Sequence, residues 1–181
     1  MAKKKTEPVI EPIEFPEIYI VVGADLSLRR PGWCKLYIKQ GKIIGVQLFS
    51  LDNKAKKKTH GQMLREIYDI FGKNVSNLQS SFKRYFVREK MIMNLKVPSE
   101  RDVAKVVGVM DLMLNDQEWY EIYPVTVKKL VAGSGKAEKS EVAAALEKYI
   151  GKQDYKCDDE SDAAAVAIAW LIQQGQIKEI E

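Results

Sequence analysis

The chain has 181 residues, of which 46% are hydrophobic and 30% charged, so it can bury one substantial core and is short for two domains. Its formal net charge is only +4, but the basic residues occur in clusters, which favours a polyanionic partner. Two cysteines, Cys34 and Cys157, and one histidine, His60, argue against a disulfide framework, a zinc cluster and a Ser-His-Asp triad.

The N-terminal segment, residues 1–16, is predicted to be a flexible arm. It combines charge with prolines, which helix and sheet interiors exclude. It is Lys-rich but lacks the apolar core of a signal peptide, and no later run approaches the length of a membrane span. We therefore expect one folded domain over residues 17–181, no membrane partner and a cytoplasmic location.

Three strands are predicted after the arm. Residues 17–25 are apolar at nearly every position, which is typical of a strand buried on both faces. Residues 32–39 and 42–49 alternate apolar and polar side chains on either side of a glycine-containing turn, which predicts a hairpin.

Helices and shorter strands alternate in the rest of the chain. The predicted elements are a helix over 59–80, a strand over 85–89, a helix from 99 to about 115, a strand over 119–123, two helices on either side of 133–135 and a helix over 160–174. Ser99, with Asp102 three residues later, is the predicted start of its helix. The order predicts an α/β fold, a mixed five-stranded sheet flanked by helices, as in ribonuclease H-like proteins.

Four acidic residues in three places suggest a metal site. Asp25 and Glu89 each end an apolar strand. In the ribonuclease H-like order these two strands are neighbours, so both acids are expected at the same edge of the sheet. Asp159 and Asp162 open the last helix and, three residues apart, share one of its faces. Hard cations prefer oxygen ligands gathered from several elements. If the polyanionic partner is a nucleic acid that the site hydrolyses, the chemistry calls for two Mg²⁺ ions roughly 4 Å apart. Asp25 is the predicted bridge between them, and Mn²⁺ is the expected substitute for Mg²⁺.

Each acid also has a structural interpretation. The alternatives are a turn or salt-bridge role for Asp25, an ion pair of Glu89 with Arg88 or Lys90, and a helix cap for Asp159. Asp158 and Glu160 are interpreted as solvated neighbours, although Asp158 could replace Asp159 as a ligand.

Two segments resemble the RuvC family of Holliday junction resolvases. Residues 127–142, Val-Lys-Lys-Leu-Val-Ala-Gly-Ser-Gly-Lys-Ala-Glu-Lys-Ser-Glu-Val, are similar to the family signature, in which a lysine precedes a Gly-x-Gly turn and Ala-Glu-Lys-Ser-x-Val follows it. Residues 159–169 resemble the family's terminal Asp-x-x-Asp-Ala helix, and the two strand acids match in order and approximate spacing. The resemblance covers roughly residues 17–174.

Two departures suggest a divergent branch, such as a phage-encoded one. The family's usual Asp-Pro-Gly is Asp25-Leu26-Ser27 here, and the aromatic residue commonly found after the glutamate is replaced by residues 90–93, Lys-Met-Ile-Met. The pair Asp158-Asp159 is also similar to the corresponding acids of poxvirus resolvases.

The resemblance implies a homodimeric, Mg²⁺-dependent crossover junction endodeoxyribonuclease. It would cut four-way or other branched DNA to leave 5'-phosphates, in a bacterial cell or in the host cytoplasm of a phage. Lys139 and Lys128 resemble the family's active-site lysines, whose ammonium groups stabilise charge on the phosphate; solvated helix lysines are the alternative. Residues 103–114, the counterpart of the family's dimer helix, are apolar on more than one face.

The remaining predictions concern DNA. Phosphate contacts are predicted for Arg29, Arg30, Lys83, Arg84, Lys129 and Lys136. Base contacts at the junction centre are predicted for Met91, Met93 and Trp33. The Gly133-Ser134-Gly135-Lys136 turn is not a P-loop, because Leu130 and Ala137 replace residues that a P-loop requires. Two rival functions are a nuclease for RNA/DNA hybrids or flaps and a non-catalytic junction-binding protein.

Overall fold

A computed structural model describes residues 13–53, 57–74, 82–91, 97–115, 117 and 119–177. The elements in chain order are β1 (Ile18–Asp25), β2 (Gly32–Lys39), β3 (Lys42–Ser50), α1 (His60–Asn74), β4 (Lys83–Glu89), α2 (Pro98–Leu114), β5 (Trp119–Ile122), α3 (Pro124–Ala132), α4 (Lys139–Ala145), α5 (Glu147–Ile150) and α6 (Asp158–Gln173). The five predicted strands are confirmed, as are the helices between them. The short helix α5 was not predicted, and α6 begins two residues earlier than expected.

The strands form one mixed sheet in the order β3-β2-β1-β4-β5. β1 and β2 are antiparallel, as are β2 and β3, whereas β4 lies parallel to β1 and β5 parallel to β4. The hairpin turn uses Gln40 and Gly41, both with positive φ, the backbone twist that a two-residue hairpin favours. Because β1, β4 and β5 are parallel, their C-terminal ends meet at one edge.

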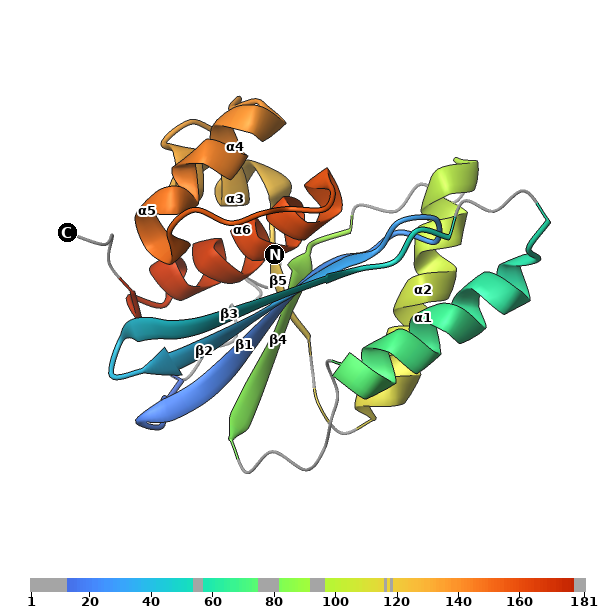
Figure 1. Cartoon of the computed structure of the whole chain (residues 1–181), viewed down its shortest axis with the longest axis horizontal. Helices are drawn as coiled ribbons and strands as arrows, with labels where there is room; N and C mark the ends of the chain where they lie inside the picture. Colours follow the sequence, from blue (N-terminus) through green and yellow to red (C-terminus); the bar gives the residue numbers. More distant parts are fainter. Residues whose placement is uncertain are drawn as a thin grey trace, which may run out of the picture.

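The two faces of the sheet are covered by different helices (Figure 1). α1 and α2 lie on one face, and α3 to α6 gather on the other. Each face has its own apolar core, one built around Phe71, Phe86 and Met110 and the other around the almost wholly buried helix α6. Within the described residues, no helix combines the length and apolarity needed to cross a bilayer.

Helix α6 approaches the sheet backbone unusually closely, because two strand residues lack side chains. A Cβ on Gly23 of β1 would overlap the carbonyl oxygen of Ala163, and one on Gly32 of β2 would overlap the carbonyl oxygen of Asp159. Small residues on the facing side of α6 allow the same approach. The start of α6 is therefore set directly against the ends of β1 and β2.

Two boundaries predicted from the sequence are wrong. Residues 13–16 were assigned to the flexible arm, but Ile13 and Phe15 pack on the core, and the Phe15 ring centroid lies 5.0 Å from that of Tyr19. Ser99 does not start α2, because Pro98 is already helical after the N-cap Val97, which makes no side-chain cap bond. Residues 1–12 of the arm and 75–80 of the predicted first helix lie outside the described residues.

Replacing Gly23 with alanine should destabilise the protein by about 3 kcal/mol, because the new methyl group has to push α6 away from β1. Gly61→Ala, in α1, is the matched control, since its Cβ would meet only the Thr59 hydroxyl at 3.9 Å and should change stability by less than about 1 kcal/mol. Urea unfolding measures both. Equal stabilities of the two variants would contradict the close approach of α6.

Candidate active site at the C-terminal edge of the sheet

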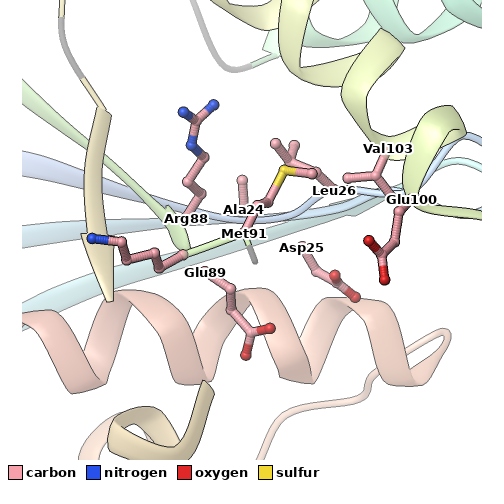
Figure 2. Close-up of a pocket in the computed structure, with 9 residues that line it drawn as sticks. Ala24, Asp25, Leu26, Arg88, Glu89, Met91, Glu100 and Val103 are labelled. Carbon is pink, nitrogen blue, oxygen red and sulfur yellow. The ribbon is translucent and has the colours of Figure 1, made fainter. Parts of the chain in front are cut away.

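Asp25 and Glu89 lie side by side at the ends of two neighbouring strands. β1 and β4 are paired in parallel with Ala24 opposite Arg88, so the next residue of each strand is an acid. Figure 2 shows both carboxylates directed toward α6, while Arg88 points to the opposite side of the sheet. This alternation is the ordinary consequence of strand geometry.

Arg88 is engaged elsewhere. Its guanidinium forms ion pairs with Asp111 at 3.3 Å and with Glu121 at 3.2 Å. The alternative in which Glu89 pairs with Arg88 is therefore wrong.

A cavity of about 240 Å³ collects five of the six predicted catalytic residues, and Asp159 is not among the residues that line it. Its lining includes, from β1, β4, α3, α4 and α6 in turn, Asp25, Glu89, Lys128, Lys139 and Asp162. The Lys139 ammonium donates a hydrogen bond to the Asp162 carboxylate. Five elements thus contribute side chains to one cavity at this edge of the sheet.

Burial and charge repulsion together raise the pKa values of the acids in the cavity. The pKa of Asp25 is raised from 3.8 to about 7, first by burial and then by the nearby charges of Asp162, Asp159 and Glu89. The pKa of Glu89 is also raised, by burial and then by Asp162. The two lysines do not fully neutralise the carboxylates. A divalent cation bound among them would supply the missing positive charge.

The two lysines oppose this repulsion. The pKa of Lys139 is raised, first by its hydrogen bond to Asp162, and its charge lowers the pKa of Asp25. Lys128 acts in the same direction on Glu89. Both lysines line the acidic cavity, although the Lys139 side chain is also 64% exposed to solvent.

Asp159 and Asp158 occupy different positions at the start of α6. Asp159 is close enough to raise the pKa of Asp25, and it forms an ion pair with Arg30 at 3.7 Å. It is not the helix cap, because the N-cap is Cys157, without a side-chain cap bond. Asp158 is exposed, and its charge acts on Lys139.

Glu160 is not the solvated neighbour that the sequence suggested. Its side chain is buried, with 1% of the residue exposed, and it accepts hydrogen bonds from the Ser50 hydroxyl at 2.7 Å and from the Lys156 backbone N–H at 2.9 Å. A buried carboxylate with these two donors ties the first turn of α6 to the end of β3. It positions its neighbours Asp159 and Asp162, a role that no local sequence signal indicated.

A second cavity, also of about 240 Å³, lies on the α2 side of the same two strand acids. Asp25, Glu89, Met91, Glu100 and Val103 are among the residues that line it (Figure 2). Met91 thus shares a cavity with the two acids, and its base contact stays a prediction.

Trp33, by contrast, is 0% exposed and packs against Phe71 in the core, so its predicted base contact is wrong. Met93 lies outside the described residues.

The predicted phosphate contacts separate into two groups. Lys83 and Arg84 begin β4, roughly 20 Å from Glu89 at the far end of the strand, so they do not belong to the acidic edge. Arg29 and Arg30 follow β1, where Arg30 forms an ion pair with Asp159, and Lys129 and Lys136 flank the end of α3, whose Lys128 lines the acidic cavity.

The Gly133–Gly135 turn joins α3 to α4. Gly133 is the left-handed C-cap of α3, and a Cβ on Gly135 would lie 2.8 Å from the Val125 Cγ1.

The donor set suits a divalent metal, although the side chains are not arranged as a finished site. Among the described residues, no three Asp, Glu, His or Cys side chains form a cluster ready to hold an ion. Asp162 is instead held by Lys139. Oxygen donors from three elements, with mutually raised pKa values at two of them, fit Mg²⁺ or Mn²⁺ in chemistry and charge.

Comparison with known proteins gives consistent matches. The family model described as "Crossover junction endodeoxyribonuclease RuvC" matches residues 21–170. The RuvC protein of Nitrobacter hamburgensis is 28% identical over 158 residues, covering 86% of this chain and 90% of the relative. That of Ehrlichia canis is 31% identical over 152 residues, covering 82% and 93%.

Among solved structures, Thermus thermophilus RuvC in complex with Holliday junction substrate matches with a TM-score of 0.69 at 16% identity, covering 90% of this chain and 99% of that one. This likeness shows the fold, which is the predicted ribonuclease H-like one. The family match spans most of the chain and includes every residue of the acidic cavity. The chain therefore belongs to the RuvC family of crossover junction endodeoxyribonucleases.

Proposed function

We propose that this protein is a homodimeric, divalent-metal-dependent endonuclease that cuts Holliday junctions and other branched DNA by phosphodiester hydrolysis. The observation that carries the proposal is the meeting of Asp25, Glu89 and Asp162 with two lysines in one cavity. Family membership supports the substrate class. Since its substrate is DNA, the enzyme would act in the cytoplasm of a bacterium or of a phage-infected host.

Each residue of the cavity has a distinct task in this proposal. Asp25, Glu89 and Asp162 would bind two Mg²⁺ ions, with Asp159 preferred to exposed Asp158 as the fourth ligand because its charge reaches Asp25. The ions, when bound, supply charge neutralisation at the phosphate and an activated water. The charges of Asp162, Asp159 and Glu89 all act on Asp25. Asp25 is therefore the proposed bridging ligand.

Lys139 has two successive partners in this scheme. Without metal its ammonium neutralises Asp162. Metal binding at Asp162 would weaken that ion pair and leave the ammonium available to the scissile phosphate, where it stabilises the charge that develops. Lys128, which also lines the cavity, contributes positive charge near Glu89.

A homodimer follows from the symmetry of the substrate, since a four-way junction is resolved by cutting two strands of like polarity. The proposed interface is α2. It buries Val106, Met110 and Leu114 against the core, yet Leu112 on its outer side is 75% exposed. Leu112 is therefore the candidate contact on this helix for a second subunit.

Cleavage of a labelled four-way junction, an RNA/DNA hybrid and a linear duplex tests the activity. We expect Mg²⁺-dependent cleavage of the junction in preference to the other two, and its loss by at least about a hundredfold in Asp25→Asn, Glu89→Gln and Asp162→Asn. Asp158→Asn should retain activity and Asp159→Asn should lose most of it. Preferential cleavage of the hybrid would sink the resolvase assignment, and junction binding without cleavage would favour the non-catalytic rival.

The raised pKa of Asp25 predicts a pH-dependent stability of the metal-free protein. Between about pH 4 and pH 7 the folded protein binds a proton that the unfolded chain has released, so the free energy of unfolding should fall as pH rises through that window. Urea unfolding in EDTA, at several pH values, measures this fall. Asp25→Asn should flatten it, whereas exposed Asp154→Asn should not; an unchanged slope in Asp25→Asn would refute the explanation.

Leu112→Glu should disrupt the proposed dimer without unfolding the subunit, because the side chain is exposed in the single chain. Analytical ultracentrifugation should then detect monomers at micromolar concentrations where the wild type is dimeric. Ile44→Glu, at a 60% exposed position on β3, is the matched control and should remain dimeric. Dimers of unchanged affinity in Leu112→Glu would exclude α2 as the interface.

A further inference from the structure

Two exposed apolar side chains lie next to the acidic cavity on its β5 side. Tyr123 is 51% exposed and Val125 is 64% exposed. Pro124, the residue between them, lines the cavity together with Glu89. An exposed aromatic ring and an exposed branched side chain therefore flank a wall of the proposed catalytic centre.

The backbone at this position is firmly held. The Tyr123 carbonyl oxygen accepts hydrogen bonds from the N–H groups of Thr126 at 2.8 Å and Val127 at 3.0 Å, which start α3. One residue earlier, the Ile122 carbonyl oxygen accepts a bond of 2.8 Å from the N–H of Lys90. Tyr123 is thereby placed beside the residue that directly follows Glu89. Because the Tyr123 backbone is already fixed by hydrogen bonds, a ligand that packs on the ring costs little further backbone conformational entropy.

The Lys90 side chain brings positive charge to the exposed ring. The Lys90 ammonium lies 5.0 Å from the centroid of the Tyr123 ring. Lys128 lines the cavity one turn along α3, and the Gly133–Gly135 turn that packs on Val125 leads directly into exposed Lys136. The surface thus combines an aromatic face with basic groups, which is the combination that binds single-stranded nucleic acid by base stacking and phosphate contact.

We propose that Tyr123, Val125 and Lys90 form a stacking platform that receives an unstacked base of the DNA strand, next to the scissile phosphate. This inference rests on the proposed function and adds the element that holds the strand beside the acids. Stacking on a tyrosine ring tolerates every base, because each has a π-face, so the platform would hold the strand without selecting a sequence. Lys90 would contact the adjoining phosphate.

The chain contains a matched control for the ring. Tyr68 on α1 is 42% exposed and has Arg65 over its face at 5.6 Å, so it is a similar tyrosine–cation pair. α1 lies on the opposite face of the sheet from α3 and α6 (Figure 1). Truncation of Tyr68 removes the same chemical group at a site that the acidic cavity does not include.

Junctions carrying 2-aminopurine on either side of the cleavage position test the platform directly. In EDTA, which prevents cleavage, the wild-type protein should quench the fluorescence of one of these bases through stacking. Tyr123→Ala should abolish this quenching and, with Mg²⁺ and unlabelled junction, lower kcat/KM by about tenfold. Tyr123→Phe, which keeps the ring, and Tyr68→Ala should behave as the wild type in both assays.

The outcomes separate this inference from the function on which it rests. Wild-type cleavage together with unchanged quenching and kcat/KM in Tyr123→Ala would overturn the platform and leave the endonuclease assignment intact. Failure of the wild type to cut any branched substrate would overturn both. An unchanged melting temperature in Tyr123→Ala, expected for an exposed side chain, confirms that the losses do not come from unfolding.

Discussion

Helix α6 rests directly on the backbone of β1 and β2, because Gly23 and Gly32 place no side chain between helix and sheet. This contact determines where the first turn of α6 lies, and with it the acids Asp159 and Asp162. Glu160 reinforces the same placement through its buried hydrogen bonds to β3 and to the preceding loop. The geometry of the acidic edge thus depends on a packing contact made by residues that have no part in the chemistry.

The same placement has an electrostatic cost. Bringing carboxylates together at a partly buried edge raises the pKa of Asp25 and of Glu89, so the metal-free site favours protonation. Lys139 offsets part of this repulsion by pairing with Asp162, and a divalent cation would offset it more fully. Stability and function therefore act in opposite directions here, as is usual where charged groups are gathered for catalysis.

Elements with a strong local signal were predicted well. The buried run of β1 and the alternating hairpin of β2 and β3 have the strand period along their whole length. The predictions failed for residues whose burial depends on contacts with segments far away in the sequence. Trp33 is an apolar residue near a strand end whose burial depends on packing against α1, and Phe15 is part of a proline-containing segment that nonetheless packs on Tyr19. Glu160 was misread because a carboxylate is usually solvated, and only the approach of β3 buries it.

The sequence by itself determined the order of the strands and helices, the four candidate acids and the family resemblance, because periodicity and motifs are properties of neighbouring residues. Only the tertiary structure decided which of those groups meet. It joined Asp25 to Glu89 through the parallel pairing of β1 and β4, and separated Lys83 from them by the length of a strand. It also placed Tyr123 beside the cavity. These relations depend on pairing and packing between segments far apart in the chain, which no local pattern encodes.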